Sequence, residues 1–119
     1  MSNTNTIVDL INAGIQAENL RQKAIASNFA NFETPGYRRL DVKFEEVLAA
    51  CAGSYDAADL SRADPEIYEP KRTLVKADGN DTSMEVEVGE MIKNSLRHKA
   101  YIRLLSRKYS QIELAISLK

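Results

Sequence analysis

The apolar residues in the last third of the chain recur in alternating steps of four and three. Such spacing is typical of the seam along which one helix packs lengthwise against another. Ten positions follow it without a break, and we call them the heptad seam; eight are apolar: Met84, Val88, Met91, Ser95, His98, Ile102, Leu105, Tyr109, Ile112 and Ile116.

Residues 83–119 are therefore predicted to form one long helix, which would measure roughly 54 Å from Ser83 to Leu118 at about 1.5 Å per residue. Thr82, with Glu85 three residues later, predicts a capping box at its start. A compact domain of this length has a radius of gyration of about 13–14 Å. The helix therefore needs a long partner, either in the same chain or in a neighbouring subunit.

Residues 1–34 are predicted to hold a second long helix. The first six residues are polar, and we expect them to be frayed, with the helix starting at Thr6. The helix should stop near Phe32, because Pro35 disfavours a helical conformation at Thr34. Small residues on one side would let another helix approach closely. The three- and four-residue steps run through Leu10, Ala13, Ala17, Leu20, Ala24, Ser27 and Asn31.

Thr34-Pro35-Gly36-Tyr37 predicts a type II turn, because Pro presets φ at the second position and Gly tolerates positive φ at the third. Residues 35–52 should comprise this turn and a short extended or helical segment. Within it, apolar residues alternate at Leu40, Val42 and Phe44, which predicts extended structure before a helical turn over 46–52.

Residues 53–82 are predicted to be a variable loop, because their apolar side chains are scattered and Pro and Gly recur. A short strand is predicted at 73–76. The fold class that follows is mainly α: two long terminal helices form a coiled-coil-like hairpin, with a short extended segment and a loosely ordered middle insertion.

The net charge is −1, which argues against a dedicated nucleic-acid binder. The charge is unevenly placed: residues 41–90 hold thirteen acidic and five basic residues, and residues 91–108 hold six basic residues and no acidic one. These are either two solvated faces or surfaces that pair head to tail between subunits. No stretch is apolar enough to span a membrane, and no cleavable secretory signal is visible, which on its own would suggest the cytoplasm.

The sequence offers little catalytic chemistry. His98 is the only histidine, so no triad or multi-histidine metal site is expected within one chain. Cys51 is the only cysteine and is interpreted as an ordinary small apolar residue. The five glycines are isolated, so no phosphate-binding loop is expected. We therefore expect no enzyme activity, no catalytic, metal or cofactor site, and no cofactor.

Two stretches carry a resemblance to a known family. Residues 26–38, Ala-Ser-Asn-Phe-Ala-Asn-Phe-Glu-Thr-Pro-Gly-Tyr-Arg, resemble the N-terminal signature of flagellar rod and hook axial proteins, usually Ser-Asn-Ile-Ala-Asn-x-x-Thr-Pro-Gly-Tyr; Phe29 stands where Ile is usual. Gly79-Asn80, Glu85-x-Glu87 and residues 94–109 are similar to the proximal rod proteins of the flagellar basal body. The ending usual in FlgC-like rod proteins, Arg-x-Tyr-x-Ala-Asn, is missing.

The resemblance implies a structural subunit of the proximal rod that assembles with itself and with other proteins through its terminal helices. It implies a periplasmic location in the basal body, reached through the flagellar type III export apparatus without a cleaved signal. The implied partners are FlgC-like rod proteins, the ring–rod adapter protein, the membrane-embedded ring and the export apparatus, with no nucleic acid and no small-molecule substrate.

The residues expected to act in assembly come from both helices and the turn: Asn28, Ala30, Asn31, Thr34, Pro35, Gly36, Tyr37, Leu96, Tyr101, Leu105, Tyr109, Ile112 and Ile116. For Asn28 and Asn31, local capping and a contact between subunits are both open. Two other functions also stay open. One is a small helical adapter or regulator that binds a partner helix, and the other is a nucleic-acid binder that uses the basic residues of 91–108.

Overall fold

The computed structural model describes residues 2–52 and 64–118, except for the side chains of residues 2–5, 51 and 52. The interpretation of Cys51 and the prediction for residues 53–63 therefore lie outside the described part. The elements in chain order are helix α1 (Ser2–Ala30), strand β1 (Asp41–Lys43), helix α2 (Glu45–Ala52), strand β2 (Glu66–Tyr68) and helix α4 (Met84–Ser117).

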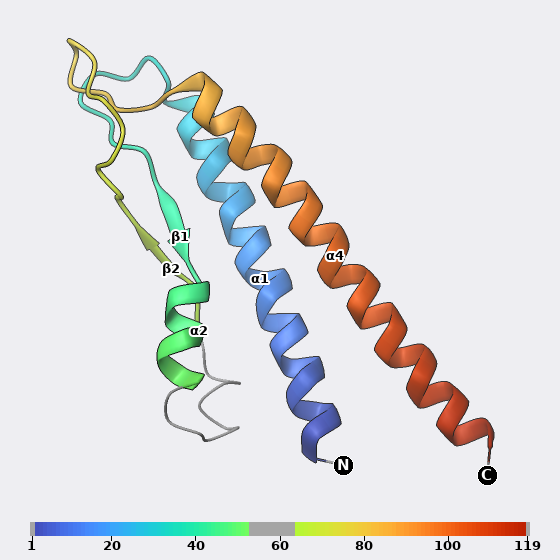
Figure 1. Ribbon diagram of the computed structural model, residues 1–119. Helices are drawn as coiled ribbons and strands as arrows, with labels where there is room; N and C mark the ends of the chain where they lie inside the picture. Colours follow the sequence, from blue (N-terminus) through green and yellow to red (C-terminus); the bar gives the residue numbers. More distant parts are fainter. Residues whose placement is uncertain (1, 53–63, 119) are drawn as a thin grey trace.

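The elements form three layers side by side. Helix α1 lies in the middle, with α4 along one side and the β1–β2 ribbon and α2 along the other (Figure 1). The molecule measures 66 × 29 × 14 Å, and its radius of gyration is 17.9 Å, against about 13–14 Å for a compact domain of this length. The predicted mainly helical fold with two long terminal helices is confirmed, and its shape is a long, thin slab.

Helix α1 is longer at its start than predicted. It begins at Ser2, so the expectation of six frayed residues and a start at Thr6 was wrong. No Gly or Pro precedes Gly14, so nothing in the sequence stops the helix from extending. It ends at Ala30, two residues before the predicted Phe32, and residues 31–33 form a turn.

The turn after α1 has the predicted geometry. Gly36 has φ +76°, and the Tyr37 amide donates a hydrogen bond to the Thr34 carbonyl at 3.2 Å, as a type II turn requires. The Gly36 amide donates to the Asp78 carbonyl at 2.9 Å, which ties this turn to a second one at Gly79, where φ is +85°. Two glycine turns therefore meet at the end of the slab opposite the chain termini (Figure 1).

Of the two strands in the ribbon, the sequence predicted only the extended segment that contains β1. Strand β1 runs antiparallel to β2, with Val42 opposite Ile67. The alternation at 40–44 is reflected in buried Val42 and Phe44. The strand predicted at 73–76 was wrong: these residues are irregular, because the Lys76 amide and carbonyl both close the turn at 76–80.

The apolar core is small and lies between α1 and the α2 layer. Phe44 is packed against fully buried Ala17, with Ala13, Val47 and Leu48 around it. A small residue at position 17 lets the Phe44 ring approach the axis of α1. This cluster therefore lies on the side of α1 that faces α2.

The predicted capping box at the start of α4 was also wrong. The N-cap residue is Ser83, and its side chain makes no capping hydrogen bond. The Thr82 amide and hydroxyl both donate to the side-chain oxygen of Asn80 instead. Thr82 thus serves the preceding turn and not the helix.

We expect Gly36→Val to lower the free energy of unfolding by about 1–3 kcal/mol, because a β-branched residue is strained at positive φ. A Cβ atom at position 36 would have no heavy atom within 4 Å, so the loss comes from the backbone and not from a clash. Gly36→Asn is the matched control, since Asn tolerates this region and should lose less. Equal denaturant midpoints for Gly36→Val and the wild type would contradict this account.

Candidate assembly surface

Asn28 joins three segments of the chain and is fully buried. Its amide nitrogen donates to the Leu40 carbonyl at 2.9 Å and to Glu87 Oε2 at 3.0 Å. Its oxygen accepts from the Leu40 amide at 2.8 Å and from the Tyr37 hydroxyl at 2.9 Å. All four hydrogen-bonding positions of the side chain are used. Asn28 thus holds the chain before β1 against α1 and reaches α4.

Asn80 closes the turn after α1, a role that sequence reasoning missed. Its buried amide nitrogen donates to the carbonyls of Asn31, Phe32 and Thr34 at 2.8, 3.1 and 2.8 Å. All three carbonyls belong to the turn that follows α1, so Asn80 holds this turn against the segment that leads into α4. Lys76 adds a hydrogen bond to the Phe32 carbonyl at 3.0 Å. The sequence showed only a turn at Asp78-Gly79-Asn80-Asp81, without its partner.

A first buried ion pair lies where β1 and α4 approach α1. The Arg39 guanidinium donates from Nε to Glu87 Oε1 at 2.7 Å, and both side chains are nearly inaccessible to solvent. Burial alone would lower the pKa of Arg39, but the hydrogen bond and charge of Glu87 raise it above its ordinary value. The Arg39 amide also donates to Asp81 Oδ1 at 2.6 Å. Helix α4 is therefore fixed at its start by charged groups.

A second polar cluster lies about two helical turns further along α4. Asn94 donates to the backbone carbonyl and the carboxylate of Glu18 at 2.7 and 2.9 Å. Arg21 bridges Glu18 and Glu45, which links α4 to α2 through α1. Although burial raises the pKa of Glu45, the hydrogen bonds to the carboxylate and the positive charges of Arg21 and Arg97 together lower the pKa below its ordinary value.

Tyr101 packs against α1 at a glycine. A Cβ atom on Gly14 would lie 2.5 Å from the Tyr101 ring, so only glycine leaves room for it. Burial, followed by the charges of Glu45 and Glu18, raises the pKa of the Tyr101 hydroxyl. Tyr101, predicted as an assembly residue, thus contributes to the contact between α1 and α4 within one chain.

These contacts leave most of the heptad seam on the surface. The side of α4 that bonds α1 carries Glu87 and Asn94, one position before the seam residues Val88 and Ser95. Leu105 and Ile112 lie on that same side, about five turns after Glu87 and Asn94, and are half-buried, as is His98. The other apolar seam residues are exposed by 38–68%: Met84, Val88, Met91, Ile102, Tyr109 and Ile116. The intrachain partner α1 therefore leaves most of the seam uncovered.

Known proteins identify the family. No family model matches the chain. A flagellar basal body rod protein FlgB of Cereibacter sphaeroides is 31% identical over 105 residues, covering 81% of this chain and 82% of the relative. FlgB of Bacillus subtilis is 26% identical over 121 residues, covering 94% and 93%. FlgB of Borrelia hermsii is 26% identical over 127 residues, covering 92% and 94%.

The chain belongs to the FlgB family. The resemblance to flagellar rod proteins is thereby confirmed. Within this FlgB-family chain, the signature stretch divides into an inner and an outer part. Asn28 is buried, Asn31 is half-buried and bonds the Ser27 carbonyl at 2.8 Å, and half-buried Tyr37 bonds the Ser27 hydroxyl at 2.9 Å. Ala30 and residues 34–36 are exposed.

The C-terminal assembly residues of the FlgB-family chain are similarly divided. Tyr101, Leu105 and Ile112 are half-buried, whereas Leu96, Tyr109 and Ile116 are exposed by 63%, 55% and 68%. Only the exposed ones are fully accessible to another molecule. Their roles in assembly stay predictions.

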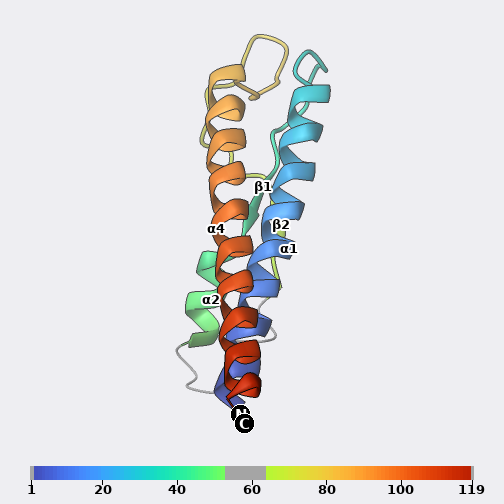
Figure 2. The same ribbon diagram turned by 90° about the vertical axis from the view of Figure 1, so that its right-hand side faces the viewer.

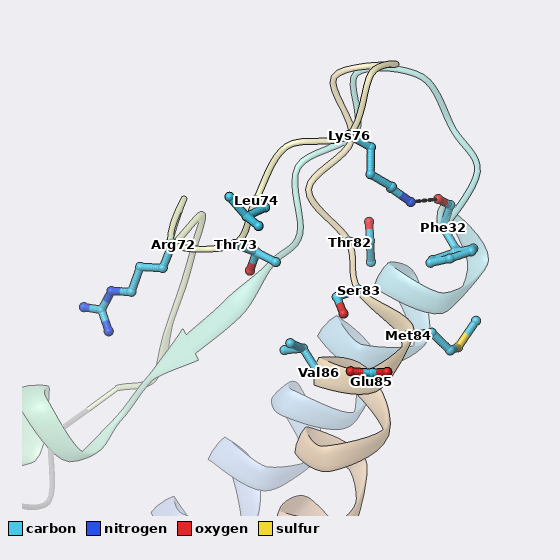
Figure 3. A pocket seen from close by; sticks show the side chains of 10 residues that line it. All are labelled: Phe32, Arg72, Thr73, Leu74, Lys76, Thr82, Ser83, Met84, Glu85 and Val86. Carbon is cyan, nitrogen blue, oxygen red and sulfur yellow. Dashed lines mark hydrogen bonds between the residues drawn. The ribbon is translucent and has the colours of Figure 1, made fainter.

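A hollow of about 620 Å³ opens beside the start of α4 (Figure 3). Lys76 spans it toward Phe32, whose ring lies 3.9 Å from the Lys76 ammonium. Neither a histidine nor a cysteine lines it. Across residues 2–52 and 64–118, no group of His, Cys, Asp and Glu could hold a metal ion, and no helix is long and apolar enough to cross a membrane.

We expect Asn80→Asp to lower the free energy of unfolding by about 1–3 kcal/mol, because it removes the buried donor that bonds three carbonyls of the turn after α1. Asn12→Asp makes the same chemical change on the exposed side of α1 and should have little effect. Urea unfolding of both variants measures the difference. Indistinguishable midpoints for the two variants would refute this role of Asn80.

The Arg21–Glu45 contact should make stability depend on acidity. Because the pKa of Glu45 is lower in the folded state than in the unfolded chain, the folded state binds fewer protons. Its contribution is present above the ordinary pKa of 4.5 and is lost as pH falls through the lower folded value. Glu45→Gln should therefore flatten the fall in melting temperature below pH 4.5. Its neighbour Glu46, exposed and with no ion pair among the described residues, gives the control Glu46→Gln.

Proposed function

We propose that this chain is a structural subunit of the proximal rod of the bacterial flagellar basal body. In this proposal it assembles with copies of itself and with other rod proteins through its terminal helices. Its membership of the FlgB family supports the rod assignment. The observation that carries the assembly role is the heptad seam of α4, which α1 leaves exposed although its spacing suits another helix.

Helix α4 has polar contacts on one side and exposed apolar side chains on another, which supports this role. Its contacts to α1 include buried hydrogen bonds, as in Asn28–Glu87 and Glu18–Asn94. Exposed apolar side chains in a continuous stripe mark interaction surfaces. Burying them yields about 25 cal/mol per Å² of apolar surface. The free energy of apolar burial on α4 therefore becomes available when a neighbour covers the seam.

The polar contacts between α1 and α4 set the register of the hairpin. Charged and amide groups must meet their own partners, since a buried unpaired charge is costly. Sliding α4 by one turn along α1 would separate Asn94 from Glu18 and Glu87 from Arg39 at the same time. The exposed seam is thus held at a fixed height, which a regular assembly requires.

The proposal places the chain in the periplasmic rod, reached through the flagellar type III export apparatus without a cleaved signal. Its partners are other rod proteins such as FlgC-like subunits, the ring–rod adapter protein and the membrane-embedded ring. The role is structural and not enzymatic, and it involves neither nucleic acid nor a small-molecule substrate. The small apolar core around Phe44 suits a chain that must unfold for export.

Two side chains of equal exposure provide the test. Ile102 lies on the heptad seam and Leu104 lies about 200° around the helix, and each is exposed by 45%. In a strain lacking the native gene, Ile102→Asp should abolish swimming and remove the chain from purified basal bodies. Leu104→Asp should preserve both.

Circular dichroism of the purified variants separates failed folding from failed assembly, and both should match the wild type because neither position is buried. A strain that swims normally without the gene would exclude the rod role. A stable dimer of the purified protein at low concentration, together with its absence from basal bodies, would point to a helical adapter instead. Normal rods with Ile102→Asp would exclude the seam as the contact surface.

A further inference from the structure

We propose that neighbouring copies of this chain meet edge to edge, with the outer side of α4 in one copy against the α2–β2 edge of the next. The inference rests on the proposed rod function, since it names the surfaces through which subunits would stand side by side. It concerns a different face of α4 from the heptad seam.

The slab has two long edges of different composition. In Figure 1, α1 lies between α4 on one side and the ribbon with α2 on the other, and α1 makes the main contacts to both α4 and β1. In Figure 2, turned by 90°, α2 and α4 both lie to the left of α1. The width of 29 Å spans the three layers, and the thickness of 14 Å is close to one helix, whose diameter with side chains is about 10–12 Å. Helix α4 and the α2–β2 layer therefore form opposite edges.

The outer side of α4 is basic and partly apolar. Residues two positions apart lie about 200° around a helix, so Leu96 is opposite Asn94, and Lys99 and Arg103 are opposite Tyr101. Leu96 is exposed by 63% and the nearby Ile92 by 55%. Within the described part of the chain, no acidic group pairs with exposed Lys99, Arg103 or Arg107.

The opposite edge carries exposed acidic residues and an exposed apolar one. Ile67 on β2 is exposed by 52%. The described residues supply no cationic partner for exposed Glu46, Asp64 or Glu66. Among the described strands, β2 pairs only with β1. Three unpaired carboxylates on this edge thus match three unpaired cations on the other.

The two edges lie at the same height along the slab. Asn94 of α4 bonds Glu18 of α1, and Glu18 shares Arg21 with Glu45 at the start of α2. The ribbon follows at that level, since Lys43 lies opposite Glu66 in the strand register. Two copies placed side by side without a large axial shift would therefore bring Lys99 and Arg103 near the acidic edge of the next copy.

Charge selects this pairing over the symmetric ones. Two α4 edges facing each other would oppose cations to cations, and two α2–β2 edges would oppose carboxylates, both of which are unfavourable. Pairing of unlike edges is heterologous: each added copy presents the next free edge, so the contact continues around a ring or a helix. In this proposal, the acidic and basic parts of the chain pair across the edges of neighbouring copies, whereas the sequence left open solvated faces or a head-to-tail pairing.

Charge reversal on each edge tests the inference. In a strain lacking the native gene, Lys99→Glu with Arg103→Glu should make like edges meet, and so should Glu46→Lys with Glu66→Lys. Each pair should lower rod assembly by about tenfold or more. The chain with all four substitutions, whose net charge equals that of the wild type, should recover assembly. Co-expression of the two double variants should recover it too, because their edges complement each other.

Cross-linking tests directly whether the outer side of α4 in one copy lies beside β2 of the next. In a Cys51→Ser background, Leu96→Cys and Ile67→Cys in separate co-expressed chains should give a dimer with a short bismaleimide in purified basal bodies. Leu104→Cys with Ile67→Cys is the control and should give little. The edge-reversed double variants should lose the Leu96–Ile67 product, and the fourfold variant should regain it.

The outcomes separate this inference from the rod function. A chain present in basal bodies that gives no Leu96–Ile67 product would overturn the edge contact and leave the rod role intact. Equal assembly of the wild type and both double variants would also overturn it. So would a fourfold variant that matches the wild type in circular dichroism and fails to assemble. Absence of the wild-type chain from basal bodies would refute the rod role itself.

Discussion

Buried polar contacts hold α1 and α4 together, and the other features of the structure depend on these contacts. The backbone carbonyl and the carboxylate of Glu18 both accept hydrogen bonds from Asn94. The carboxylate of Glu87 accepts hydrogen bonds from Asn28 and Arg39. Buried groups of this kind give little net stability but penalise every wrong alignment. The hairpin is therefore specific in register, and its apolar residues are left for other contacts.

Three sides of α4 carry different kinds of residue. One side holds α1 through Glu87, Asn94 and Tyr101, a second carries the exposed heptad seam, and a third presents Ile92 and Leu96 with unpaired cations. At the tip of the slab, Asn80 and the two glycine turns fix where the chain leaves α1 and enters α4. These contacts at the tip therefore fix the position and direction in which α4 starts.

Sequence reasoning reached the fold because its main signals are local. Periodicity predicted both long helices, and the Pro35-Gly36 pair predicted the turn, since each signal acts within a few residues. It missed Asn80 and the Glu18–Asn94 contact, whose partners lie 46 to 76 residues apart. Polar residues on a helix usually read as solvated, so nothing local marked Glu18 or Glu87 as buried. The seam was recognised, but periodicity states which residues share a side and not which neighbour covers it.

A body 66 Å long and only 14 Å thick has a mechanical consequence. Resistance to bending rises steeply with thickness, so a lone copy would flex across its thin dimension far more easily than along its width. Neighbours joined at the edges would form a curved wall, and a curved wall resists bending more strongly than a flat one of the same thickness. The stiffness of such a wall would then be a property of the joined copies and not of a single one.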